Sequence, residues 1–207
     1  MLINQSIKSK FDRTIGTGTT TVAYQPMYVY YDYGYFGNIY TPTELSVGLP
    51  VWITGIRIRM LSNGSYSSDR QTLKLGYCNK EEFDINVRNT FQQVPLTTGG
   101  FTSTGITNVK NNFNWAIVSS DENGRWIEIN FDTPFNYDPT LGNLIVIWEN
   151  RDGTYIGGTA SAPASVCSTN GTFNSYYDYA DGSMPSSDNA GTRASNGRPN
   201  IQLLISV

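Results

Sequence analysis

The sequence predicts an all-β fold in a single domain of 207 residues, and three observations support this prediction. Residues 126–131 alternate apolar and polar side chains, which is the period of a strand with one buried face. Residues 144–148 form a short continuous apolar run, typical of a central strand covered on both faces. Only 15% of the residues are charged, which argues against both disorder and helical repeats.

The same patterns predict further strands in chain order. Apolar residues alternate with Arg57 and Arg59 in one segment, and Leu73 and Leu75 alternate with Lys74 in the next. Glycines 16 and 18 would bend the chain where the first strand begins. The segments predicted to be strands on this basis are residues 14–22, 51–61, 72–77 and 199–207.

Other segments are expected to connect strands. Residues 79–112 are rich in threonine, glycine and asparagine and predict mainly connecting chain. Residues 121–124 (DENG) form a turn signal that would join residues 115–119 and 126–131 into a hairpin. Pro134 is expected to end the second of these strands, because proline has no N–H to donate to a sheet.

The first residues are expected to form an arm, residues 1–13, in front of a β domain that comprises residues 14–207. Ile3, Ile7 and Phe11 recur every four positions, so a short helix would place them on one face. One interpretation is a peptide that docks on a neighbouring subunit through these three residues. The other is a terminal segment that lies on its own domain, and the spacing favours neither.

Tyrosine is concentrated in two segments, residues 24–40 and 176–179. Tyrosine rings can stack on sugars or form protein contacts with little loss of side-chain entropy. Tyrosine also simply favours the half-buried face of a sheet, with its hydroxyl in water. The candidate contacts to a glycan or a protein partner are Tyr28, Tyr30, Tyr31, Tyr33, Tyr35, Tyr176, Tyr177 and Tyr179.

The side-chain inventory offers little for catalysis. The chain has no histidine, which excludes Ser-His-Asp and Cys-His catalysis and imidazole metal ligands. Cys78 and Cys167 are expected to be free thiols in the core. Asp181-Gly182 suits a turn better than a calcium site. Carboxylate pairs remain as an enzymatic option, but we expect no enzyme, cofactor or metal.

Charge and hydropathy limit the partners further. The net charge of −3 predicts no general attraction to nucleic acid or to an anionic membrane. No apolar stretch approaches the ~20 residues of a membrane span. Residues 1–13 lack the apolar core and cleavage site of a secretory signal, so we expect a protein that is made and used without export.

Several motifs resemble, in the same order, a β-sandwich module of Bacteroidetes proteins, over roughly residues 14–205. These motifs are Ile15–Thr21, the tyrosine-rich segment up to Ile39–Thr41, Glu44-Leu45, Trp126–Ile129, Asp132–Tyr137 and Arg198–Ile201. The resemblance implies a single jelly-roll-like β-sandwich without enzyme chemistry of its own, and it carries over no binding residue.

Modules of that kind occur as accessory domains of secreted or surface proteins and in phage virion proteins. The resemblance, together with the missing export signal, leads us to expect a bacteriophage virion protein: a capsid decoration, head-fibre or tail-associated subunit. Its partners would be other virion proteins, in a homo-oligomer or a capsid lattice, and a host surface glycan. The alternative is a carbohydrate-binding module or adhesin at a bacterial surface.

Overall fold

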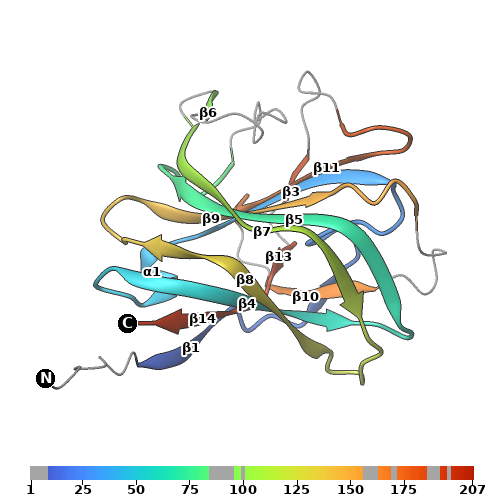
Figure 1. Ribbon diagram of the computed structural model, residues 1–207, viewed down its shortest axis with the longest axis horizontal. Coiled ribbons are helices and arrows are strands. Elements are labelled where there is room, and N and C mark those ends of the chain that lie inside the picture. The colour runs from blue at the N-terminus through green and yellow to red at the C-terminus, as the bar shows by residue number, and fades with distance from the viewer. Residues whose placement is uncertain are drawn as a thin grey trace, which may run out of the picture.

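The computed structural model describes residues 9–83, 96–98, 101–155, 163–168, 172–185, 192–194 and 197–207. Within these residues the chain forms two antiparallel sheets of seven strands each, which face one another as a β-sandwich (Figure 1). The prediction of a single all-β sandwich is confirmed.

The first sheet, sheet A, follows the order β1-β14-β4-β10-β13, with β2 paired to β10 and β8 paired to β4. Its strands are β1 (Lys10–Ile15), β2 (Thr20–Val22), β4 (Val51–Leu61), β8 (Arg125–Tyr137), β10 (Ala164–Ser168), β13 (Arg198–Pro199) and β14 (Ile201–Ser206). The first and last strands of the chain therefore lie side by side.

The second sheet, sheet B, follows the order β12-β11-β3-β9-β5-β7-β6. Its strands are β3 (Tyr33–Tyr40), β5 (Tyr66–Cys78), β6 (Leu96–Thr98), β7 (Phe101–Ile117), β9 (Asn143–Asn150), β11 (Ser175–Ala180) and β12 (Thr192–Ala194). A one-turn helix, α1 (Pro42–Leu45), follows β3 and precedes the long strand β4.

The main core lies between the two sheets. Ile56 and Ile58 of β4 face it from sheet A, while Leu73 and Leu75 of β5 face it from sheet B. Their chain neighbours Arg57 and Lys74 point to the outside, as the alternation in the sequence predicts.

Strand β9 occupies the centre of sheet B and is covered on both faces, as its continuous apolar run predicts. Leu144, Val146 and Trp148 belong to the core between the sheets. Ile145 and Ile147 belong to a smaller buried cluster on the outer face. Both faces of the strand are therefore dry, which explains the absence of alternation.

Two predictions about the middle of the chain were wrong. Residues 101–112 were expected to be connecting chain but lie in β7, whose threonines and asparagines pair with β5. The turn at Asp121–Gly124 does form, but it joins β7 of sheet B to β8 of sheet A instead of closing a hairpin. A local turn signal does not determine which sheet the next strand enters.

The expectation that β8 ends at Pro134 was also wrong, since the strand continues to Tyr137. Its pairing to β4 is interrupted there: Gly55 lies opposite Asn130, whereas Ile53 lies opposite Phe135. The strand thus accommodates the missing N–H in a bulge and then resumes its pairing.

The chain does not form the expected helix up to Arg13. Lys10–Arg13 belong to β1, which pairs with β14 from Lys10 opposite Ser206 to Ile15 opposite Ile201. Phe11 is half-buried and packs against the core of its own sandwich. Ile3 and Ile7 lie outside the described residues, so their docking role stays a prediction.

Cys78 and Cys167 are both buried free thiols, as predicted. Burial raises the pKa of each thiol to about 12, so both stay protonated at pH 8. We therefore expect no reaction with Ellman's reagent at pH 8 in the folded protein and reaction of both thiols in denaturant. Rapid labelling of the native protein, measured by absorbance, would contradict this burial.

Candidate functional site

The two tyrosine-rich segments of the sequence meet in the structure. Tyr31 and Tyr179 lie with ring centroids 4.1 Å apart, and Tyr28 meets Tyr179 edge-on at 4.9 Å. Tyr177 is stacked parallel to Tyr179 at 5.8 Å. Together these contacts define the tyrosine cluster, which consists of Tyr24, Tyr28, Tyr30, Tyr31, Tyr177 and Tyr179.

A buried glutamine holds the two segments together. Gln25 is fully buried, and its Nε2 donates to the carbonyl of Tyr176 in β11 at 3.0 Å. Its Oε1 accepts from Nδ2 of Asn38 in β3, also at 3.0 Å. Because both of its ends are paired, Gln25 fixes the β2–β3 connection against sheet B.

A second polar network links the β2–β3 connection to the core. Trp148 donates from Nε1 to Oε1 of Gln71 at 2.6 Å, and Gln71 donates to Oδ1 of Asn150 at 2.6 Å. Asn150 in turn donates to the backbone carbonyl of Tyr31 at 3.2 Å. The position of Tyr31 is thus coupled to a tryptophan in the centre of sheet B.

The rings of the tyrosine cluster are half-buried. Burial, followed by the neighbouring tyrosines, raises the pKa of Tyr28 and of Tyr179 above its ordinary value. Both hydroxyls therefore stay protonated at neutral pH and can donate hydrogen bonds. Their rings offer partly exposed faces of the kind that pack on apolar surfaces.

An open hollow of about 510 Å³ adjoins the tyrosine cluster. It is lined by Tyr30, Tyr31 and the strongly exposed Tyr155, together with the carboxylates of Asp32 and Asp181. Asp32 Oδ2 accepts from the backbone N–H of Gly182 at 3.2 Å, which ties the two sides together. Rings beside carboxylates can stack on a sugar and accept hydrogen bonds from its hydroxyls.

Three of the predicted tyrosines lie elsewhere. Tyr35 and Tyr176 are buried on the outer face of sheet B, where Tyr176 packs against Phe83. Tyr33 lines a different hollow on that outer face. The strand period of two could have separated Tyr176 from Tyr177 and Tyr179, but no pattern in the sequence placed Tyr155, Asp32 or Asp181 beside these rings.

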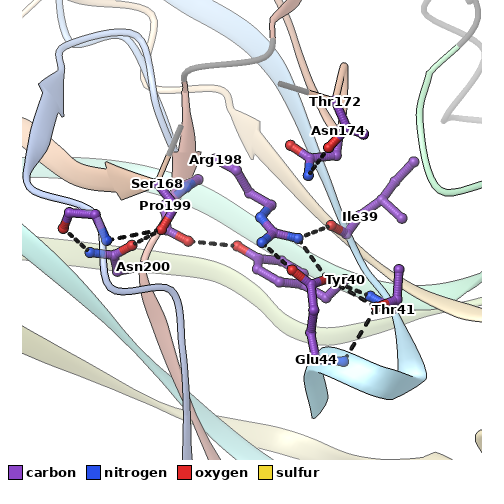
Figure 2. Close-up of polar contacts among 11 residues, drawn as sticks. Ile39, Tyr40, Thr41, Glu44, Ser168, Thr172, Asn174, Arg198, Pro199 and Asn200 are labelled. Atoms are coloured by element: carbon purple, nitrogen blue, oxygen red, sulfur yellow. Dashed lines mark hydrogen bonds and ion pairs between the residues drawn. The ribbon is translucent and has the colours of Figure 1, made fainter. Parts of the chain in front are cut away.

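Three of the motifs that carry the resemblance, Ile39–Thr41, Glu44-Leu45 and Arg198–Ile201, meet around a buried arginine (Figure 2). Arg198 donates to both carboxylate oxygens of Glu44 and, from Nη1, to the carbonyl of Ile39 at 2.9 Å. Its guanidinium carbon lies 4.7 Å from the ring centre of Tyr40, whose hydroxyl donates to the carbonyl of Pro199. These contacts join β13 of sheet A to β3 of sheet B.

Glu44 serves α1 as well as Arg198. The Thr41 hydroxyl accepts from the N–H of Glu44, and the Glu44 carboxylate accepts from the N–H of Thr41, which is a capping box. Burial acts to raise the pKa of Glu44, but hydrogen bonds from Arg198 and Thr41 outweigh it and lower the pKa overall. We assign the contacts among Arg198, Glu44 and Thr41 a role in folding.

Glu128 and Glu149 do not form an acid–base pair, because they lie on different sheets. Glu149 is held by Lys74 and Arg151 on sheet B, whereas Glu128 is held by Arg57 on sheet A. Each is thus neutralised by a neighbouring cation, unlike the two carboxylates that flank a bond in glycosidases. In the described part of the chain, no three His, Cys, Asp or Glu side chains gather as metal ligands would.

No helix among the described residues is long and apolar enough to cross a membrane.

Comparison with known proteins does not identify this chain. No model of a known protein family matches the sequence, and no curated protein matches it either.

Proposed function

We propose that this chain is a non-enzymatic structural protein of a bacteriophage particle: a capsid decoration, head-fibre or tail-associated subunit assembled in the host cytoplasm. The motif resemblance supports the particle, and one surface of sheet A supports the anchoring to neighbours. This surface, called the Trp52 surface below, consists of Trp52, Thr54, Pro134 and Ser206 around a hollow of about 190 Å³.

The Trp52 surface is apolar and open. Trp52 is 43% exposed and lies opposite Ser206 in the sheet. Val207, the next residue, is 53% exposed. Exposed tryptophan beside other apolar groups is typical of protein–protein contacts, because burial of such a ring stabilises a complex strongly.

The described part of the arm starts beside this surface. Ser9 accepts a hydrogen bond from the N–H of Val207 at 3.0 Å, and the start of β1, the start of β4 and the C-terminus lie at one end of the sandwich (Figure 1). Residues 1–8 (MLINQSIK) contain four apolar side chains. We assign the Trp52 surface to this segment of a neighbouring copy, which would link subunits into an oligomer or lattice.

Deletion of residues 2–8 should abolish incorporation into particles while leaving the domain folded. The deletion stops before Lys10, because removing residues up to 13 would also remove the edge strand β1. Incorporation is measured by sedimentation of a lysate from the source cells, with the chain quantified by mass spectrometry against a major coat protein. Undiminished co-sedimentation of the truncated chain would contradict the anchoring.

Trp52→Ala should reduce incorporation in the same way and lower the oligomeric state in analytical ultracentrifugation. Val118→Ala is the matched control, because Val118 is also exposed but follows the last residue of β7 in the other sheet. A native chain that is monomeric and found only in medium or envelope fractions would overturn the virion proposal. In that case the arm covers its own domain.

A second candidate function is glycan binding, by a carbohydrate-binding module or adhesin. The observation that favours it is the meeting of the two tyrosine-rich segments beside the hollow of Tyr30, Tyr31 and Tyr155. Tyr155→Ala should weaken binding on a glycan array about tenfold or more, since a stacking ring would be lost. Phe173→Ala, which removes an exposed ring outside the tyrosine cluster, should have no effect. An array without signal for the native protein would refute this function.

A further inference from the structure

A second hollow, of about 500 Å³, lies on the outer face of sheet B. Thr72 and Lys74 of β5 line it, and they point away from the core that Leu73 and Leu75 fill. Residues from β3, β7 and β9, together with Arg151 directly after β9, complete the lining, so the hollow extends across the middle of the sheet. We call it the sheet-B hollow.

The sheet-B hollow is positively charged, although the chain as a whole carries a net charge of −3. Arg70, Lys74 and Arg151 supply three cations, and Glu149 supplies the single carboxylate of the lining. A concentration of cations in an acidic protein favours an anionic ligand, since a charged cleft focuses the local potential.

Glu149 positions two of these cations. Its side chain is only 3% exposed, and it accepts from Lys74 Nζ and, at 3.0 Å, from Arg151 Nε. Arg151 is held further by Tyr35, whose hydroxyl accepts from Nη2 at 3.3 Å. Both cations are thus fixed in place before a ligand arrives, which lowers the entropic cost of binding.

Arg70 is the cation most available to a ligand. Its side chain is 53% exposed, and its Nε donates to Asp69 Oδ1 at 3.1 Å. Among the described residues, neither Nη group of Arg70 has a hydrogen-bond partner. A guanidinium with a free edge can bind a carboxylate through two parallel hydrogen bonds.

Neutral groups line the rest of the hollow. Asn108, Asn111 and Asn112 come from β7, and Tyr33 adds an aromatic ring. Thr72 donates to Oδ1 of Asn111 at 2.9 Å, which leaves the Asn111 amide N–H groups for a ligand. Amides and an aromatic ring suit a ring that carries several hydroxyls, whereas a bare inorganic anion would use only the cations. The volume lies within the range of ~300–1,000 Å³ that small-molecule sites occupy.

We propose that the sheet-B hollow binds an acidic saccharide, a sugar residue that carries a carboxylate beside its hydroxyls. Arg70 binds the carboxylate, Lys74 and Arg151 complement its charge, and the asparagine amides bind the hydroxyls. This inference does not rest on the virion proposal, and the site is separate from the tyrosine cluster.

The test is isothermal titration calorimetry of the full chain at low and physiological salt. The probes are 3′-sialyllactose and digalacturonate as acidic saccharides, lactose as the neutral counterpart, and inorganic phosphate as an anion without a sugar. We expect saturable binding of at least one acidic saccharide, weakened by salt, and at least about tenfold weaker binding of lactose and phosphate.

Arg70→Gln should weaken that binding about tenfold or more. Arg125→Gln makes the same charge change at an exposed position of β8 on sheet A and should leave binding unchanged. Loss of that binding in Tyr155→Ala, with Arg70→Gln unaffected, would instead place it in the hollow beside the tyrosine cluster and overturn the proposal. Circular dichroism of each variant establishes that it is folded.

Two results with the native chain would overturn the proposal. One is the absence of binding by both acidic saccharides at millimolar concentration. The other is equal binding of lactose or phosphate, which would show that the carboxylate or the sugar is not recognised. An equal effect of Arg70→Gln and Arg125→Gln would likewise place the binding elsewhere.

Discussion

Replacing Arg198 with alanine is expected to lower the free energy of unfolding by about 3 kcal/mol, because the change removes one partner of a largely buried ion pair. Arg198 is 3% exposed and bonds to Glu44 and to the Ile39 carbonyl. Without it, the Glu44 carboxylate keeps only its contacts to Thr41, the Ile39 carbonyl loses this donor, and the ring of Tyr40 loses its cation. Urea denaturation followed by circular dichroism measures the change.

Arg198→Lys separates charge from geometry. A single ammonium cannot reproduce the paired contacts of the guanidinium, so this variant should lie between Arg198→Ala and the native protein. Arg125→Ala, at an exposed position, should stay within about 0.5 kcal/mol of the native protein. Equal stabilities of Arg198→Ala and Arg125→Ala would rule out a folding role for the arginine.

The dependence of stability on acid pH is an independent test of the ion pair between Glu44 and Arg198. The pKa of Glu44 in the folded protein lies below its ordinary value of 4.5. The ionised carboxylate therefore contributes stability that is complete above that value and is lost as the pH falls through the lowered pKa. Glu44→Gln should remove this part of the dependence of the free energy of unfolding on acid pH. Near neutral pH it should hardly change how that free energy depends on pH.

The sequence predicted the strands that bury one or both faces away from water, because burial determines which of their side chains are apolar. Residues 51–61 match β4, and the apolar run 144–148 lies within β9. The pattern failed at β7, because one of its faces carries polar threonines and asparagines that resemble a connection. It also failed at Asp121–Gly124, since a turn looks the same whether the next strand stays in its sheet or enters the other.

Of the two candidate sites, the sequence predicted part of one but did not predict the other. Tyr28, Tyr31 and Tyr179 were predicted as contacts from composition, and sheet order then brings them together, since β11 lies next to β3. The sheet-B hollow could not be predicted, because Arg70 and Asn111 become neighbours only through the pairing of β5 with β7. Such a site depends on which strands pair, and local patterns do not determine that.

The second large effect is expected for Trp148→Ala, at about 4 kcal/mol, because the change leaves a cavity in the centre of the core. Trp148 is 1% exposed, and its ring lies 4.6 Å from that of Trp115 and 5.6 Å from that of Phe113. Since β9 is covered on both faces, little of the surrounding sheet can collapse into the space. Urea denaturation again measures the loss.

Trp148→Phe tests whether the core also positions the tyrosine cluster. Phenylalanine preserves much of the packing but cannot donate to Gln71, so this variant should lose about 1–3 kcal/mol for the unpaired carbonyl. Because Gln71 leads through Asn150 to the carbonyl of Tyr31, we also expect faster amide hydrogen exchange in residues 28–33. Unchanged exchange there, despite the lost stability, would mean that the tyrosine cluster is independent of the core network.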